Sequence, residues 1–267
     1  MSMSKREPVL SGPRTRNAPR AEPRLSVSLA RSPAEVELAQ RLRFKVFAEE
    51  LGARLPGAGS GLDSDEFDDW CDHLIVRDDD RERAVGTYRI LPPHRARALG
   101  RLYTETEFDL TRLAHLRPTM VEVGRACVHR DYRNGSALLM LWAGLAHYMK
   151  SNGYRHLIGC ASAALGDGGR QAARLRDELL PHFVEAECRV FPRLPFPHGR
   201  LERAATVEVP PLIKGYLRLG ARIGGEPAWD PDFNSADFMM WLSLDRIDLR
   251  YARRFDVLAG QAAPASA

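Results

Sequence analysis

Two charged side chains, Glu122 and Arg125, lie inside an apolar stretch of the sequence. The segment around them, residues 121–128 (VEVGRACV), has the β-branched composition of a buried strand, where an ionised side chain needs a partner. Gly124 stands between the two charges, and a glycine inside a strand pattern is a sign of a β-bulge. Residues three apart in a regular strand point to opposite faces, so a bulge would turn both side chains toward one cleft. A carboxylate placed in this stretch therefore needs a reason.

A second concentration of charge comes earlier in the chain. Six of the ten residues from Asp63 to Asp72 are acidic, and like charges this close repel each other. The segment is therefore either solvated and flexible or held near cations, such as arginines or a substrate ammonium group. Phe67 and Trp70 within it favour the second alternative, although anchoring of the loop to the core would also explain these rings.

The sequence before this acidic segment predicts a helix. Ser32, Pro33 and Glu35 form a capping box that starts it, and Gly52 is placed to end it. Arg43 and Phe47 lie one turn apart on this helix. Periodicity alone predicts that Phe47 packs in the core and that Arg43 is solvated.

A hairpin follows the acidic segment. His73–Arg77 and Ala84–Leu91 read as strands joined by a polar turn, and Arg89 lies inside the apolar second strand as a candidate cleft-facing cation. His73 and Asp78 have the HxxxxD spacing of glycerolipid acyltransferases. We reject that reading because an odd spacing on a strand points the two side chains to opposite faces.

A basic turn follows the central strand and opens a helix at about Ser136. Backbone amides at a helix start attract anions, and Arg130 and Arg133 lie beside this one, although surface salt bridges would also explain the two arginines. A strand at His156–Ala161 and a helix at Arg170–Leu179 continue the alternation that is typical of an α/β layer. We also expect strands at Val184–Phe191, Thr206–Val209 and Phe238–Leu244, and helices at Lys214–Gly220 and Asp245–Phe255, with a short helix at Leu110–Leu116 inside an irregular insertion, residues 92–118.

Composition limits the class of protein. The 267 residues are 44% hydrophobic and 28% charged, as in ordinary globular proteins, and no apolar run approaches the roughly 18 residues needed to cross a bilayer. The four cysteines form no CxxC pair, which predicts neither a metal site nor a disulfide framework. The N-terminus lacks the apolar core of a secretory signal, so we expect a cytoplasmic protein.

The net charge of +4 belongs to one segment. Residues 1–24 carry six basic and two acidic residues, whereas the remainder carries 33 of each sign, so the charge does not indicate nucleic-acid binding. We expect residues 1–24 to be a disordered basic tail, available for peripheral contact with the inner membrane surface. Residues 25–256 then form one domain, and 257–267 form a second disordered tail.

The order of these features along the chain resembles that of the acyl-homoserine-lactone synthases. The longer sequence segments are more similar to those of the ornithine lipid biosynthesis N-acyltransferases. The segments that carry this resemblance are DEFDDWCDHLIV, VGTYRIL, VEVGRACV and PPLIKGYLRLGARIGGEPAWDPDFNSADF, in order between about Arg31 and Phe255. The resemblance implies a GNAT-like α/β fold, with a central mixed twisted sheet, helices on both faces and a C-terminal extension. It also implies transfer of a 3-hydroxyacyl group from acyl carrier protein to the α-amine of L-ornithine, giving lyso-ornithine lipid.

The implied reaction gives the flagged residues roles. Glu122 would be the base that deprotonates the amine, directly or through water. Asp65 and Asp68 could bind ammonium groups, and the three arginines could pair with the α-carboxylate or brace the acidic loop. Amides near Gly124 could hold the thioester carbonyl. The residues implied in substrate binding are Arg43, Phe47, Asp65, Asp68, Arg89 and Arg125, and those implied in acyl-donor binding are Gly124, Arg130, Arg133, Asn134 and Gly135.

The loop that would bind the acyl donor departs from the pattern of acetyl-CoA enzymes of this fold. Acetyl-CoA enzymes of this fold carry an RxxGxG/A-type loop, of which residues 132–137 (YRNGSA) keep only part. A carrier-protein thioester has a single phosphodiester and an acidic protein surface, for which Arg130, Arg133 and Lys150 would suffice. This favours acyl carrier protein over coenzyme A, with no permanently bound cofactor.

Two alternatives remain open at the level of sequence. A related N-acyltransferase could act on another amino acid, or an acyl-homoserine-lactone synthase on S-adenosylmethionine, and product mass separates these. A non-catalytic lipid-associated protein is the other alternative, and for it Glu122 would be dispensable.

Overall fold

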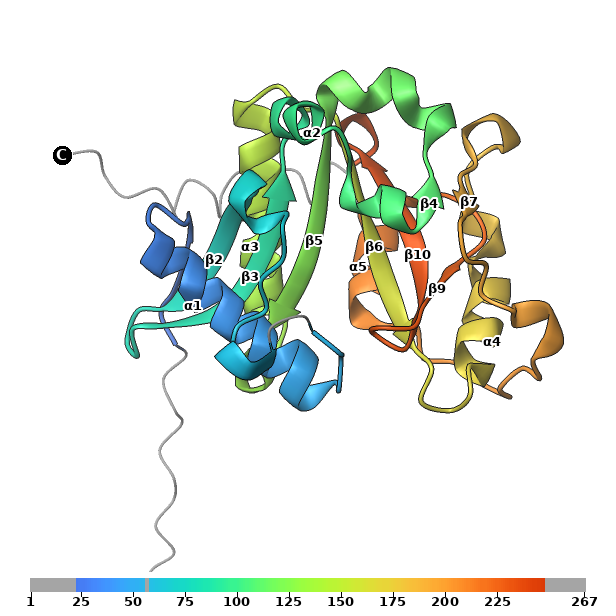
Figure 1. Ribbon diagram of the computed structural model, residues 1–267, viewed down its shortest axis with the longest axis horizontal. Coiled ribbons are helices and arrows are strands. Elements are labelled where there is room, and N and C mark those ends of the chain that lie inside the picture. Colours follow the sequence, from blue (N-terminus) through green and yellow to red (C-terminus); the bar gives the residue numbers. More distant parts are fainter. Residues whose placement is uncertain (1–22, 56–57, 248–267) are drawn as a thin grey trace, which may run out of the picture.

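An eight-stranded mixed sheet forms the centre of the protein in the computed structural model, which describes residues 23–55 and 58–247 (Figure 1). Neighbouring strands are antiparallel except for β5 and β6, which are parallel. In spatial order the strands are β1 (Leu25–Leu29), β2 (Asp72–Asp78), β3 (Arg83–Leu91), β5 (Met120–Val128), β6 (His156–Ala164), β10 (Ser235–Ser243) and β8 (Arg222–Ile223), with β9 (Ala228–Asp230) also paired to β10. A separate two-stranded ribbon joins β4 (Phe108–Asp109) to β7 (Phe191–Pro192).

Helices cover both faces of this sheet, as the resemblance implied. The alternation along β2 explains which side chains meet which helix: Leu74 lies beside Gly144 of α3 (Ser136–Ser151), whereas the adjacent His73 accompanies the acidic loop next to α1 (Pro33–Phe44). Figure 1 shows α1 in front of the sheet and α3 behind it. The other helices are α2 (Pro93–Leu99), α4 (Arg170–Leu179) and α5 (Pro211–Arg218).

The start of α1 follows the sequence signal with one change. The Ser32 hydroxyl accepts a hydrogen bond from the amide of Glu35 (3.3 Å), as an N-cap does. The Glu35 carboxylate, however, accepts from the amide of Arg31 (2.6 Å) instead of Ser32. The helix continues as a π-helix over Lys45–Glu50 and ends before Gly52, whose φ is +74°.

The two parallel strands separate soon after they begin. β5 and β6 are paired only from Met120–His156 to Glu122–Ile158, and Figure 1 shows them close at one end and apart at the other. Gly159 lies at the point of separation, where a Cβ atom would come within 2.2 Å of the carbonyl oxygen of Val123. Only glycine therefore allows the two strands to approach this closely.

A β-bulge in β5 accompanies this separation. Arg89 pairs with Gly124 and Thr87 pairs with Cys127, so β5 has one more residue than β3 over this interval. The residue with left-handed backbone is Arg125 (φ +51°), not Gly124. The predicted bulge is thus present one position further on, where the ion pairs of the Arg125 side chain help to hold an uncommon conformation.

Other expectations were wrong or only partly right. Val184–Phe191 is no strand, because Val184 and Val190 each donate one backbone bond toward β8 around a 3-10 turn instead of forming a ladder. Thr206–Val209 finds no strand partner in the described residues.

Helix α2 lies in the insertion, residues 92–118, and was not predicted. The short helix that was predicted in this insertion is a 3-10 segment, Thr111–Thr119. Of the expected C-terminal helix only the 3-10 turn Leu244–Arg246 is described; the rest of that helix, residues 1–22 of the expected basic tail and the tail 257–267 lie outside the described residues.

No helix in the described part of the chain has the length and hydropathy needed to span a bilayer.

Candidate active site

Glu122 is buried at the point where β5 and β6 begin to separate, with 4% of its surface exposed. Its two carboxylate oxygens each accept one backbone hydrogen bond, from the amides of Tyr103 and Thr104 (both 2.6 Å). Burial raises the pKa of Glu122, and the hydrogen bonds from the 3-10 segment Tyr103–Thr106, together with nearby Arg89, oppose that rise. Sequence reasoning missed Tyr103 and Thr104, because backbone donors in an irregular segment leave no pattern of residue types.

A small cavity of about 30 Å³ adjoins Glu122. This is enough room for at least one water molecule. Both Glu122 and Arg125 line it, together with Arg89, Tyr103 and Gly124. The structure therefore brings both charged residues of the central strand to one cavity, as the bulge predicted.

Arg43 is fully buried at the centre of a charge network with the acidic loop. It donates to Asp63 (Nε to Oδ2, 3.0 Å) and, through both terminal nitrogens, to Asp68 (3.0 and 2.7 Å). Periodicity alone predicted a solvated Arg43, which is wrong because the loop folds over α1 and supplies the carboxylates. Asp63 is only 1% exposed and was not singled out from its acidic neighbours by sequence reasoning.

Arg89 and Arg125 complete this network from β3 and β5. Arg89 donates to Asp65 (2.5 Å) and Asp68 (3.2 Å). Arg125 lies 3.3 Å from Asp63 and 3.2 Å from Asp65. Three arginines thus meet three aspartates, and Arg43 and Arg89 hold the pKa of Asp68 below its ordinary value against the effect of burial.

The network favours one of the roles that the sequence left open. The arginines brace the acidic loop, and Asp68 is almost fully enclosed by its partners. Asp65 is the more accessible of the two aspartates expected to bind ammonium groups, with its side chain 17% exposed. Substrate binding by Asp65 and Asp68 stays a prediction, and the geometry makes Asp65 the better candidate of the two.

Aromatic rings pack against the Arg125 end of the network. The guanidinium carbon of Arg125 lies 4.8 Å from the ring centroid of Phe233 and 5.3 Å from that of Tyr103. Phe47, on the π-helix that extends α1, packs edge-on against Phe233 at 5.9 Å. Phe47 is therefore one ring removed from Arg125.

The turn predicted to hold the acyl donor lies at the start of α3. Arg130 is exposed, whereas Arg133 donates to Glu50 (2.6 Å) and to the carbonyl of Val128 (3.0 Å). The Asn134 side chain accepts from the amide of Ser136 (3.1 Å), and Gly135 has a φ of +99°. Lys150 does not belong with this turn, since it lies near the other end of α3, roughly 21 Å away.

The rejected HxxxxD pair is separated in the structure. The His73 ring lies 3.1 Å from the Asp68 carbonyl, whereas Asp78 bonds to Tyr132 and Arg81. The two side chains have different partners, as the odd spacing predicted.

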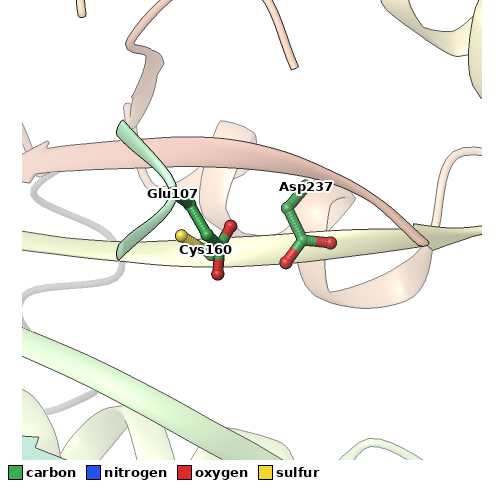
Figure 2. Close-up of side chains that lie close together, drawn as sticks. All are labelled: Glu107, Cys160 and Asp237. Carbon is green, nitrogen blue, oxygen red and sulfur yellow. The ribbon is translucent and has the colours of Figure 1, made fainter. Parts of the chain in front are cut away.

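A different set of side chains could receive a cation. Figure 2 shows Glu107, Cys160 and Asp237 pointing toward one another, with potential ligand atoms all within 4.8 Å. Cysteine spacing alone gave no sign of this group, because two of its members are carboxylates from distant segments.

Known proteins resemble this chain over most of its length. Residues 42–143 match the family described as acetyltransferase (GNAT) domain. A protein of Rhodobacter capsulatus named L-ornithine N(alpha)-acyltransferase is 36% identical over 86% of this chain and 95% of its own. Proteins with the same name from Brucella abortus (36%, covering 85% of this chain and 87% of theirs) and Rhizobium meliloti (34%, covering 89% and 86%) are similar to it as well.

A solved structure agrees with the fold. The CoA-dependent acyl-homoserine lactone synthase MesI has a TM-score of 0.50 and 12% identity, with 91% of this chain and 97% of that chain covered. At this identity the comparison shows the fold alone, which is the GNAT-like arrangement expected from the sequence.

Proposed function

Because the chain belongs to the L-ornithine N(alpha)-acyltransferase family of acyltransferases, we propose that it transfers a 3-hydroxyacyl group from acyl carrier protein to the α-amine of L-ornithine. The product would be lyso-ornithine lipid.

The observation that carries this proposal is the position of Glu122. A carboxylate with a raised pKa adjoins a cavity with room for at least one water molecule, at the place where β5 and β6 cease to be paired. Both of its oxygens already accept amide hydrogen bonds, so a water in the cavity is the more suitable relay between the carboxylate and an incoming amine.

The proposed reaction assigns the proton transfer to this arrangement. The acceptor's α-ammonium loses a proton through the relay to Glu122, and the neutral nitrogen attacks the thioester carbonyl. A C–N bond forms, the tetrahedral intermediate collapses with cleavage of the C–S bond, and the leaving thiolate takes up the proton that the nitrogen gives up as it becomes the amide. Amides on the edge of β5 beyond Glu122, near Gly124, would stabilise the oxyanion. No covalent enzyme intermediate is required.

The acyl donor would approach from the start of α3. Arg130 is exposed and so can meet a phosphodiester or an acidic carrier surface, whereas Arg133 would have to leave Glu50 to do the same. Asn134 occupies one amide of the helix start, which leaves fewer donors for a pyrophosphate. These features support acyl carrier protein as the donor. We place the reaction in the cytoplasm at the membrane surface, where a long-chain product would partition.

A matrix of donors and acceptors tests the proposal. Purified protein is incubated with 3-hydroxyacyl carrier protein or the matching acyl-CoA, and with L-ornithine, L-lysine or S-adenosylmethionine, and products are identified by mass spectrometry. We expect the ornithine amide with the carrier-protein donor. A homoserine lactone product, or an amide of another amino acid in its place, would reject the assigned acceptor.

A further inference from the structure

The Glu107–Cys160–Asp237 group has an imbalance of charge that distinguishes it from the arginine network. Glu107 follows the 3-10 segment that holds Glu122, Cys160 lies on β6 and Asp237 lies on β10 (Figure 2). Within the described residues, no ion pair joins either carboxylate to a basic side chain, whereas Asp63, Asp65 and Asp68 are each paired with arginine. Two acidic groups therefore lie together without a cation.

The carboxylates are also short of hydrogen-bond donors. Both oxygens of Glu107 are inaccessible to solvent, and in the described part of the chain no N–H or hydroxyl donor reaches them; their polar neighbours are the Cys160 thiol and the Asp237 carboxyl. Asp237 is 4% exposed and accepts from the Ser235 hydroxyl (2.7 Å). Burial and the neighbouring Asp237 raise the pKa of Glu107, and burial raises the pKa of Asp237 as well. An oriented, buried carboxylate that lacks a partner indicates a ligand with hydrogen-bond donors and positive charge.

The group lies next to Glu122 on the same face of the sheet. Ile158 is the register partner of Glu122. Cys160 is two residues further along β6, roughly 6.8 Å beyond Ile158 and on the same side of the sheet. Thr104 touches both sites: its amide donates to Glu122 (2.6 Å), and its hydroxyl lies 3.9 Å from the Cys160 sulfur. Thr104 is therefore the residue that joins the two sites.

We infer that the Glu107–Cys160–Asp237 group binds the side-chain ammonium of the acceptor while its α-amine lies at Glu122. The inference rests on the proposed function and adds the residues that select a diamino acid. The two nitrogens of an extended ornithine are separated by five bonds, or roughly 6 Å, which is close to the step of roughly 6.8 Å along β6 from Ile158, the partner of Glu122, to Cys160. An ammonium has three donors for the two carboxylates, and it cancels the charge that burial makes costly.

Kinetics with matched acceptors test this subsite. L-Norvaline is ornithine without the side-chain amine, so the ratio of kcat/KM for the two acceptors isolates recognition of that group. We expect Asp237→Asn and Glu107→Gln each to lower kcat/KM for ornithine about 10- to 100-fold, mainly through KM, because a hydrogen bond to a charged group is lost. The rate with norvaline should stay unchanged.

Stability in the absence of substrate provides a second readout. Each substitution replaces a buried carboxyl group, whose ionised form burial disfavours, with a neutral amide, so both variants should unfold at a temperature equal to or above that of the wild type near pH 7. Asp109→Asn is the matched control, because Asp109 is an exposed carboxylate two residues from Glu107 whose retained oxygen can still accept from Thr111. It should change neither acceptor's kinetics.

The possible outcomes separate the two proposals. A wild-type protein that acylates no ornithine would overturn the proposed function. A wild type that uses ornithine and norvaline equally, or variants that lose both acceptors in parallel, would overturn the subsite alone. The group would instead be assigned to a divalent metal ion by three results together: the purified protein contains stoichiometric metal, chelation abolishes its activity, and the Asp237→Asn variant no longer binds the metal.

Discussion

Glu122→Gln separates the two roles that the structure gives this residue. The wild-type carboxylate accepts two amide hydrogen bonds of 2.6 Å, whereas glutamine keeps one oxygen and turns an NH₂ group toward a backbone N–H. Loss of one bond and the unfavourable contact should lower the free energy of unfolding by about 1–3 kcal/mol. Loss of the base should lower kcat about 10²-fold or more, because an amide cannot accept the proton.

The measurements are steady-state kinetics and thermal unfolding of the same preparations. Since burial raises the pKa of Glu122, wild-type kcat should increase with pH through a limb above the ordinary glutamate pKa, and the variant should lack that limb. The matched control is Glu105→Gln. Glu105 accepts from the amide of Leu102 (2.8 Å) at the start of the same 3-10 segment, but it does not line the cavity.

An equal loss of kcat in Glu105→Gln and Glu122→Gln would refute the base assignment. It would show that the segment Tyr103–Thr106 needs to be held in place and that Glu122 acts only as its anchor. A folded Glu122→Gln variant with the wild-type rate would refute both roles.

Three further predictions concern the surroundings of the site. Asp68→Asn should destabilise the protein by about 3–5 kcal/mol, because it leaves buried Arg43 and Arg89 short of a counter-charge. Since the pKa of Asp68 is lowered in the folded protein, the extra stability of the wild type should be complete above about pH 4 and should disappear in acid. Denaturant unfolding of both proteins across pH measures this difference. Gly159→Ala should lower both the melting temperature and kcat, because the added Cβ forces β5 and β6 apart. Gly166→Ala is the control and should change neither quantity, because a Cβ at that position meets no other atom within 4 Å. Arg130→Ala should raise KM for the carrier-protein donor several-fold at low salt with kcat unchanged, and the difference should shrink as salt is added; a salt-independent or absent effect would exclude Arg130 from the docking surface.

Local signals in the sequence predicted most of the elements that build the site. The capping residue Ser32 marks the start of α1, and the hydrophobic alternation of β2, β3 and β5 gives their positions within one or two residues. The presence of Glu122 and Arg125 in an apolar strand was informative because burial makes unpaired charge costly. The same reasoning predicted a bulge between them, although its left-handed residue is Arg125.

Sequence patterns did not predict the contacts between residues that are far apart in the chain. Arg43 looked solvated because periodicity describes one helix and says nothing of a loop that folds over it. The amides of Tyr103 and Thr104 carry no side-chain signature, and Glu107, Cys160 and Asp237 come together only through the order of the strands. Val184–Phe191 had strand composition, but its buried valines pack beside β8 without a ladder.

The most direct test of the account follows the two nitrogens of the acceptor. L-Ornithine labelled with ¹⁵N at either the α- or the δ-amine is acylated by the purified protein, and the product amide is located by fragmentation in a mass spectrometer. With Glu122 at the α-amine, the label should appear in the amide only for α-labelled ornithine, and Glu122→Gln should lower the rate at which that product forms about 10²-fold or more. Acylation of the δ-nitrogen, or formation of the α-amide at the wild-type rate without Glu122, would contradict the central claim.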